Sequence, residues 1–179
     1  MSFAAVTGRA VRWGVMGTGT IAHDFVKVLQ ALPNCEVAAV GSRSDEGAAR
    51  FGDAHNISGR HGSYEALARD DSLDIVYVAT PSMRHVDDSL LCLEAGRHVL
   101  CEKAMAPSLQ EAKKVVDKAV AEDRFFLHGV WSRFFPAMSE IRKTLQSGII
   151  GDVYAAHASF GQNDGAGQAS ATLETGIYC

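Results

Sequence analysis

Short apolar runs alternate with helix-length amphipathic segments along the first 128 residues, and this alternation constrains the fold more than any other feature. The apolar runs have the length of strands and lie at residues 11–16, 36–41, 74–79, 98–101 and 125–128. The amphipathic segments lie at residues 20–32, 45–51, 63–68, 84–95 and 108–122. Such alternation is typical of a parallel sheet covered by helices. The sequence therefore predicts an α/β fold with a doubly wound parallel sheet.

Two of the predicted helices carry clear signals at their ends. Gly96 directly follows the segment 84–95, where glycine commonly ends a helix in a left-handed conformation. Ser108 and Glu111 form a capping-box pattern behind Pro107, which predicts that a helix begins there.

A glycine pattern follows the first predicted strand directly. In "GVMGTGTIAHDF", Gly17, Gly19 and Ala22 form a G-x-G-x-x-A motif at the start of the first predicted helix. Gly17 permits a tight turn, Gly19 permits close approach of a pyrophosphate, and Ala22 permits close packing of helix on strand. A turn of small residues that serves packing alone is the alternative. The order of strand, glycines and helix favours a Rossmann dinucleotide site, with contacts from Gly17, Thr18, Gly19, Thr20, Ile21 and Ala22.

The end of the second predicted strand indicates which dinucleotide is bound. NAD sites usually carry an acidic residue there, which holds the ribose hydroxyls. This chain instead reads "GSRS", so Ser42 and Arg43 could bind a 2′-phosphate, and NADP(H) is favoured over NAD(H). A solvated arginine in a turn is the alternative.

Composition and charge exclude several other classes of function. The net charge of −4 and the pI near 5.9 give no basic footprint for nucleic acid. No apolar run approaches the roughly 20 residues of a membrane span, and the first 13 residues lack the apolar core of a secretion signal. The four cysteines have no Cys-x-x-Cys spacing, so we expect reduced thiols, no metal site and a cytoplasmic protein. An organelle-targeting role of the N-terminus stays open, because no acidic residue precedes Asp24.

The pattern changes after residue 130. A helix is predicted at 136–146, a stop at Gly148, and a strand at 153–160 in which apolar residues alternate. We therefore divide the chain into a dinucleotide-binding domain, 1–130, and the start of an incomplete α+β substrate or dimerisation domain, 131–179.

The stretch "YVATPSMRHVDDSLLCLEAGRHVLCEKAM" resembles the Gfo/Idh/MocA oxidoreductase family. Members carry A-T-P, a following histidine, an E-A-G-x-H-V turn and an E-K-P motif in this order. The segments "HGVWSRFFPA" and "LETGIYC" are similar to the branch of dimeric dihydrodiol dehydrogenases and NADP-dependent D-xylose 1-dehydrogenases.

This resemblance implies roles for residues that lie near the predicted strand ends. The lysine of the motif, Lys103, would reach the nicotinamide and the reacting hydroxyl. The resemblance places four more residues beside the cofactor: Thr80, Pro81, His85 and Glu102. The fold gives an independent reason to place these residues at a ligand site, because the carboxyl ends of strands in an open parallel sheet converge on the ligand crevice. Taken alone, Lys103 would be a surface lysine and His85 equally a residue on a helix surface.

The resemblance also implies substrate-side residues in the C-terminal part. Tyr178 matches the acid-base tyrosine of the branch and would take the substrate's hydroxyl proton, with Glu174 in the catalytic set. Trp131 and Arg133 match an active-site segment that would contact the substrate. An isolated tyrosine is more often a packing residue, so the role of Tyr178 rests on the resemblance.

Three departures from the family pattern bear on activity. Ala104 replaces the proline of the E-K-P motif, the segment before Tyr178 is shortened, and the large antiparallel sheet of the family is absent from the sequence. We expect a truncated NADP-dependent dehydrogenase that acts on CH–OH groups of a small sugar, polyol or trans-dihydrodiol, and a homodimer only in a full-length form. A non-catalytic nucleotide-binding paralogue or fragment is the alternative, and a nucleotide-sensing interaction protein stays possible.

Overall fold

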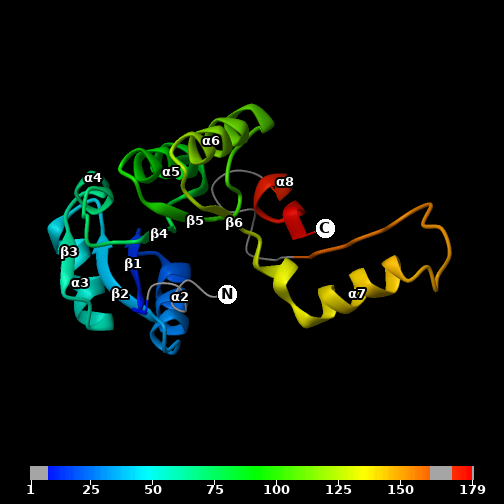
Figure 1. Ribbon diagram of the computed structural model, residues 1–179, viewed down its shortest axis with the longest axis horizontal. Coiled ribbons are helices and arrows are strands. Elements are labelled where there is room, and N and C mark those ends of the chain that lie inside the picture. Colours follow the sequence, from blue (N-terminus) through cyan, green and yellow to red (C-terminus); the bar gives the residue numbers. More distant parts are fainter. Residues whose placement is uncertain (1–7, 162–170, 179) are drawn as a thin grey trace. The chain divides into compact units, whose positions relative to one another are not determined.

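The computed structural model describes residues 8–161 and 171–178 and contains a six-stranded parallel sheet (Figure 1). The strand order is β3-β2-β1-β4-β5-β6, so the chain winds outward in both directions from β1. This confirms the predicted doubly wound fold. The strands are β1 (Val11–Met16), β2 (Cys35–Gly41), β3 (Gly59–His61), β4 (Ile75–Val78), β5 (His98–Glu102) and β6 (Phe126–Gly129).

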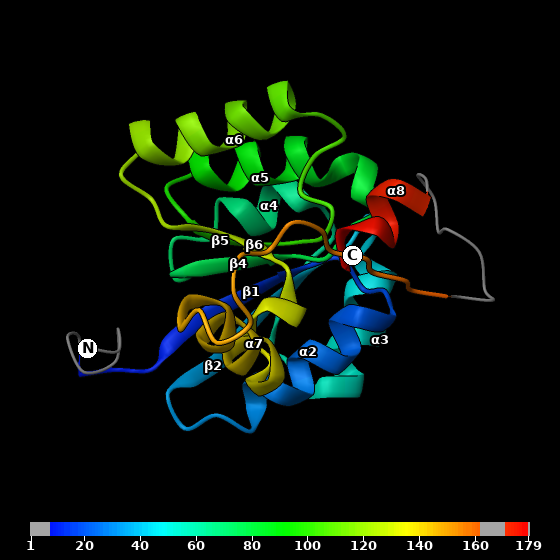
Figure 2. The ribbon, with the colours of Figure 1, turned by 90° about the vertical axis from the view of Figure 1, so that its right-hand side faces the viewer.

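Helices cover both faces of the sheet. Figure 2 shows α4, α5 and α6 on one side and α2 and α3 on the other. Each side has its own apolar core. One core contains Val76, Val99 and Leu93, and the other contains Val15 and Val40. The helices are α2 (Thr20–Gln30), α3 (Asp45–His55), α4 (Tyr64–Ala68), α5 (His85–Glu94) and α6 (Leu109–Ala121), with a short 3₁₀ turn, η1 (Ser82–Arg84), before α5.

The helix-end signals act as predicted. Gly96 adopts a left-handed conformation after α5, with φ of 79°. The hydroxyl of Ser108 accepts a hydrogen bond from the backbone N–H of Glu111 at 3.2 Å and so caps α6. The carboxylate of Glu111 pairs with Lys114 at 2.5 Å.

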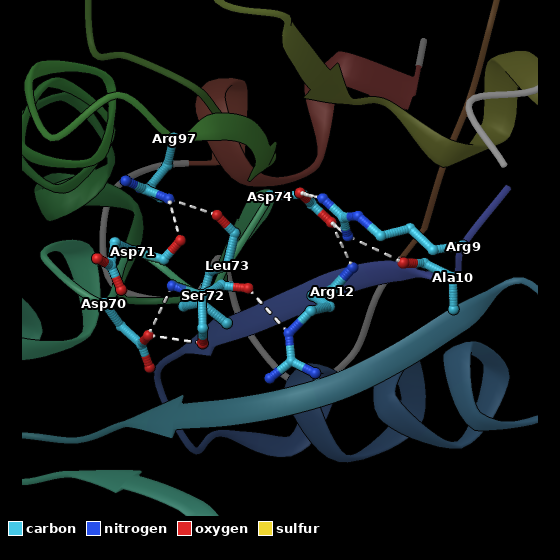
Figure 3. A network of polar contacts seen from close by, with 9 residues as sticks. All are labelled: Arg9, Ala10, Arg12, Asp70, Asp71, Ser72, Leu73, Asp74 and Arg97. Carbon is cyan, nitrogen blue, oxygen red and sulfur yellow. Dashed lines mark hydrogen bonds and ion pairs between the residues drawn. The ribbon is translucent and has the colours of Figure 1, made fainter. Parts of the chain in front are cut away.

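A polar network ties β1 to β4 at the end of the sheet where these strands begin (Figure 3). Arg9 donates two hydrogen bonds to the Asp74 carboxylate at 2.6 and 2.7 Å, and the backbone N–H of Arg12 adds a third at 2.8 Å. The same network holds the loop before β4, because Arg12 Nε donates to Ser72 O and Arg97 donates to Leu73 O. The network therefore fixes one end of the sheet, and the loops at the opposite end, after the strands' carboxyl ends, can carry binding residues.

The chain divides into two compact units, Met1–His128 and Gly129–Cys179. The second unit contains η2 (Trp131–Phe134), α7 (Pro136–Gln146), α8 (Ala171–Glu174) and η3 (Gly176–Tyr178). The predicted helix 136–146 and the stop at Gly148, with φ of 70°, are both confirmed.

The strand predicted at 153–160 is not formed. Residues 151–161 have no regular secondary structure, and their side chains are exposed. A strand needs a hydrogen-bonded neighbour, and the described residues of this unit contain no strand that could provide one. Alternating apolar residues therefore gave a misleading signal. Among the described residues, no helix combines the length and the apolar character needed to cross a bilayer.

Candidate dinucleotide site

The loop between β1 and α2 has the geometry expected for a phosphate-binding turn. Gly17 has φ of 103°, and a Cβ atom there would lie 2.7 Å from the carbonyl oxygen of Ala79. At Gly19, by contrast, a Cβ atom would meet nothing within 4 Å. Gly17 therefore serves the close approach of β1 and β4, whereas Gly19 keeps a space beside the backbone open.

The N-terminus of α2 faces this turn without a competing acid. Gly19 is the N-cap and has no side chain, and the first turn of α2 has no acidic residue. The first hydrogen bonds of the helix come from Ala22 and His23, which both donate to Gly19 O at 3.0 and 3.2 Å. The N–H groups of Thr20 and Ile21 precede these bonds, at the positive end of the helix dipole. This arrangement suits an anion.

A cavity of about 410 Å³ opens beside the turn. It is lined by loops that follow the carboxyl ends of β1, β2 and β4 and by the start of α4. The lining residues are Gly17, Thr18, Gly19, Ser42, Arg43, Tyr64, Ala79, Thr80 and Pro81. The structure thus brings seven of the predicted cofactor residues into one site.

Ser42 and Arg43 lie at the end of the cavity formed by the β2 loop. Ser42 is buried, and its backbone N–H donates to His61 O of β3 at 3.0 Å. Arg43 is exposed, so its guanidinium has the freedom to reach a ligand. Among residues 8–161 and 171–178, no acidic side chain belongs to the lining of this cavity. The absence of a carboxylate here suits a ligand with an extra phosphate.

Tyr64 and Ala79 also line the cavity, although the sequence did not predict them as site residues. Tyr64 begins α4 behind the Ser63 cap, and the Arg84 guanidinium lies 5.5 Å from the centre of its ring. Burial raises the pKa of Tyr64, so its hydroxyl stays protonated at neutral pH. A tyrosine after a helix cap carries no sequence signal that distinguishes a site residue from a packing residue.

His85 braces the loops at one side of the site. Its ring is 1% exposed, and its two nitrogens lie 2.7 Å from Thr80 O and 2.8 Å from Ala104 O. The imidazole therefore joins the loop after β4 to the segment after β5. A direct contact between His85 and a cofactor stays a prediction.

Glu102 and Lys103 lie at the carboxyl end of β5, as the sequence predicted. The Tyr77 hydroxyl donates to Glu102 Oε1 at 2.8 Å, and the Lys103 backbone N–H donates to Glu102 Oε2 at 3.1 Å. Both oxygens of the carboxylate are therefore engaged. Tyr77 is 1% exposed, and burial followed by the charge of Glu102 raises the pKa of its phenol. Glu102 thus acts as an acceptor that fixes the start of the Lys103 segment.

Ala104 occupies the place of the family's proline. It is buried, and the Lys103–Ala104 peptide is cis. The next residue, Met105, donates from its backbone N–H to His128 Nε2 at 3.2 Å. Burial and the neighbouring His85 lower the pKa of His128, so the ring is neutral and able to accept this bond.

Within the second unit, two predicted site residues contact each other. Trp131 Nε1 donates to the Tyr178 hydroxyl oxygen at 2.7 Å, and the two ring centres are 5.3 Å apart. Arg133 is exposed on η2, and its carbonyl oxygen accepts from Arg142 at 3.1 Å. Glu174 ends α8, four residues before Tyr178. Lys103 belongs to the first unit, so its meeting with Tyr178 in one site stays a prediction.

The residues of the first unit fit a dinucleotide. The open space at Gly19 would admit a pyrophosphate to the backbone, and the start of α2 would face its charge. The side-chain oxygen of Thr80, buried at the cavity wall, has no hydrogen-bond partner among the residues that the structure describes. Among the described residues, no three metal-ligating side chains come together.

Comparison with known proteins identifies the family. A family profile, GFO_IDH_MocA, described as "Oxidoreductase family, NAD-binding Rossmann fold", matches residues 11–129. The chain belongs to the Gfo/Idh/MocA oxidoreductase family. The match covers β1 through β6 and includes the loops after β1, β2 and β4 that line the cavity.

Curated relatives in this family are trans-1,2-dihydrobenzene-1,2-diol dehydrogenases. The mouse protein is 41% identical, with 95% of this chain and 54% of that protein covered. The human protein is 39% identical over the same shares. The chain therefore spans about half the length of the curated relatives it matches.

A solved structure of the family is similar in fold. It is the 3-ketoreductase KijD10 from Actinomadura kijaniata in complex with NADP. The TM-score is 0.74 at 29% identity, with 80% of this chain and 46% of KijD10 covered. The likeness places this Gfo/Idh/MocA chain among NAD(P)-binding Rossmann oxidoreductases.

Proposed function

We propose that this chain is the cofactor-binding part of a dehydrogenase that transfers hydride between NADP(H) and a hydroxyl-bearing carbon of a small sugar or trans-dihydrodiol. One observation carries the proposal. A glycine turn, a helix N-terminus, Ser42 and Arg43 line a single cavity, and none of its lining residues in the described part of the chain is acidic. NAD(H) is the less favoured cofactor, because the ribose-binding acid that its sites usually carry is missing.

Each part of the cofactor has candidate residues. Gly19 and the start of α2 would hold the pyrophosphate, while Ser42 and Arg43 would hold the 2′-phosphate. Thr80 and Pro81 would line the path toward the nicotinamide, beside Glu102 and Lys103. When bound, the nicotinamide supplies hydride chemistry. This chain's residues supply binding, orientation and proton transfer.

Tyr178 is the proposed proton acceptor for the substrate hydroxyl. Its oxygen accepts the indole N–H of Trp131, and a hydrogen bond to a phenolate stabilises the form that takes the proton. Lys103 would add positive charge near the reacting oxygen. Arg133 and Glu174 complete the proposed substrate side.

The substrate class follows from the relatives, which are named for a trans-dihydrodiol. D-xylose and similar sugars are the second class that we propose. We also propose residues 1–130 as the dinucleotide-binding domain and 131–179 as the start of the substrate domain, which the division after His128 supports. We further propose a cytoplasmic location, in keeping with the free thiols of Cys35, Cys92 and Cys101, and a homodimer for a longer form.

A second candidate function is nucleotide binding without catalysis. The observation that favours it is Ala104, which stands where the family's E-K-P motif has a proline beside the proposed catalytic lysine. A substrate must be held against the nicotinamide and shielded from water for hydride transfer.

A chimaera distinguishes the two functions. Residues 1–179 are joined to the remaining half of the mouse relative, and NADPH formation from NADP⁺ is followed with a trans-dihydrodiol and with D-xylose. The proposal predicts turnover that falls by about 10²- to 10⁴-fold in Lys103→Met and Tyr178→Phe. Turnover in both variants equal to that of the unsubstituted chimaera would contradict the roles assigned to Lys103 and Tyr178. A chimaera that binds NADPH but has no turnover would favour the second function.

A further inference from the structure

A second cavity, of about 300 Å³, adjoins the dinucleotide site. It lies between α2 and α3 and is lined by Thr18, His23, Gly47, Arg50 and Phe51. Two observations join it to the first cavity. Thr18 lines both cavities, and Gly47 lies so close to Ser42 that a Cβ atom on Gly47 would be 2.4 Å from the serine hydroxyl.

Arg50 is the arginine among the described residues that line this cavity. Its side chain is 70% exposed and projects from the second turn of α3, one turn after Gly47. Gly47 has no side chain, so nothing on that residue blocks the path from Arg50 toward Ser42. The guanidinium now pairs with the carboxylate of Glu46, which is itself 82% exposed.

The imidazole in the same cavity is already engaged. His23 Nδ1 lies 2.6 Å from His55 Nε2, and its ring packs against Phe51 at 4.5 Å between centres. One of these two nitrogens must donate and the other accept, so the pair is held together as long as one ring keeps an unprotonated nitrogen. His23 therefore forms a wall of the cavity, and Arg50 is the side chain left to attract an anion.

We propose that Arg50 is a second binding residue for the 2′-phosphate of NADP(H), and that Glu46 opposes this binding by competing for the guanidinium. The inference rests on the proposed function, because it assumes that Ser42 and Arg43 hold the same phosphate. Arginine suits this role, since its planar guanidinium donates several hydrogen bonds to phosphate oxygens at once. The phosphate must draw Arg50 away from Glu46, so the two residues affect affinity with opposite signs.

The effect of each residue is modest, because both side chains are exposed to water and salt. An exposed ion pair changes an affinity by about two- to fivefold, so we expect changes of this size in the dissociation constant for NADPH. NADH lacks the 2′-phosphate, and its affinity should not change.

The test measures the dissociation constants of NADPH and NADH with the full chain by fluorescence titration at low and at high salt. Arg50→Ala should weaken NADPH binding about two- to fivefold, and Glu46→Gln should strengthen it by a similar factor. Both effects should shrink at high salt. Arg60→Ala is the matched control. Arg60 lies in β3, pairs with Asp53 of α3 at 2.8 Å, and lines neither cavity.

The outcomes separate this inference from the proposed function. An unmodified chain that prefers NADPH, together with unchanged affinities in both variants, overturns the role of Arg50 and leaves the proposed function standing. Equal changes for NADPH and NADH also overturn it, since the effect would not involve the 2′-phosphate. No binding of NADPH by the unmodified chain overturns both. Because Glu46→Gln removes only a surface charge, its result stands even if Arg50→Ala fails to fold.

Discussion

The two glycines of the turn after β1 should respond to substitution in opposite ways. Gly17 has φ of 103°, and an added Cβ would lie 2.7 Å from Ala79 O, which is a backbone atom. Gly19 has φ of −80° and ψ of 177°, which any residue adopts, and an added Cβ would meet nothing within 4 Å. Gly17→Ala should therefore mainly destabilise the fold, whereas Gly19→Val should mainly weaken ligand binding.

The magnitudes differ enough to be measured. The left-handed conformation alone costs a non-glycine residue about 1–3 kcal/mol, and the contact with Ala79 O adds to this. With a denaturant slope of about 2 kcal/mol per molar urea, a cost of about 2 kcal/mol lowers the midpoint of Gly17→Ala by roughly 1 M, and the contact with Ala79 O lowers it further. Gly19→Val should lower its free energy of unfolding by only about 0.5–1 kcal/mol, because valine is a poorer N-cap than glycine but meets no steric clash.

For NADPH affinity, in contrast to stability, the substitution at Gly19 should have the larger effect. A valine at Gly19 would occupy the space beside the helix N-terminus and remove about two charge-assisted hydrogen bonds to the pyrophosphate, each contributing about 1.5–3 kcal/mol. A loss of at least about 3 kcal/mol of binding free energy raises the dissociation constant of NADPH more than 100-fold, since about 1.4 kcal/mol corresponds to a factor of ten. Urea unfolding and NADPH fluorescence titration on both variants test this contrast. The reasoning is wrong if folded Gly19→Val binds NADPH as tightly as the unmodified chain.

Three further predictions concern single side chains. Arg43→Ala should reduce the preference for NADPH over NADH to about the two- to fivefold that Arg50 supplies, because it removes a charged partner of the 2′-phosphate; an undiminished preference would contradict the role of Arg43. Tyr77→Phe should lower the free energy of unfolding by about 1–3 kcal/mol, because the half-buried Glu102 carboxylate loses its 2.8 Å hydrogen bond; an unchanged urea midpoint would contradict this. Hydrogen bonding from Arg9 lowers the pKa of Asp74 in the folded protein. The carboxylate therefore adds to the free energy of unfolding at pH values above its unfolded pKa of about 3.9, and this stabilisation is lost as the pH falls through the lower folded pKa. Asp74→Asn should therefore flatten the stability curve in acid, and an identical acid dependence in both proteins would exclude this role.

The sequence predicted the first unit well because its signals are local. Strand-length apolar runs, the Ser108 cap and the Gly96 stop each act within a few residues, and the structure confirms all of them. The missed strand β3 has three residues, Gly59–His61, and no apolar run, so its formation depends on pairing with β2. The helix predicted at 45–51 continues to His55, where Asn56 in a left-handed conformation ends it.

The second unit shows where local patterns fail. Alternation at 153–160 satisfied the side-chain period of a strand, but hydrogen bonding to a neighbouring strand decides whether a strand forms. At the site, the glycine turn is a local motif and could be predicted from spacing. Tyr64 comes to the same cavity through the path of the chain, which no short pattern encodes.

The central claim is that the cavity at the carboxyl ends of β1, β2 and β4 binds NADP(H). Fluorescence titration of the unmodified 179-residue chain with NADPH and with NADH, at equal salt and pH, tests it most directly. The account predicts saturable binding of both, with NADPH at least several-fold tighter, because Ser42 and Arg43 would face the 2′-phosphate and the described residues place no acid in the cavity lining. Equal affinities, or tighter binding of NADH, would contradict it.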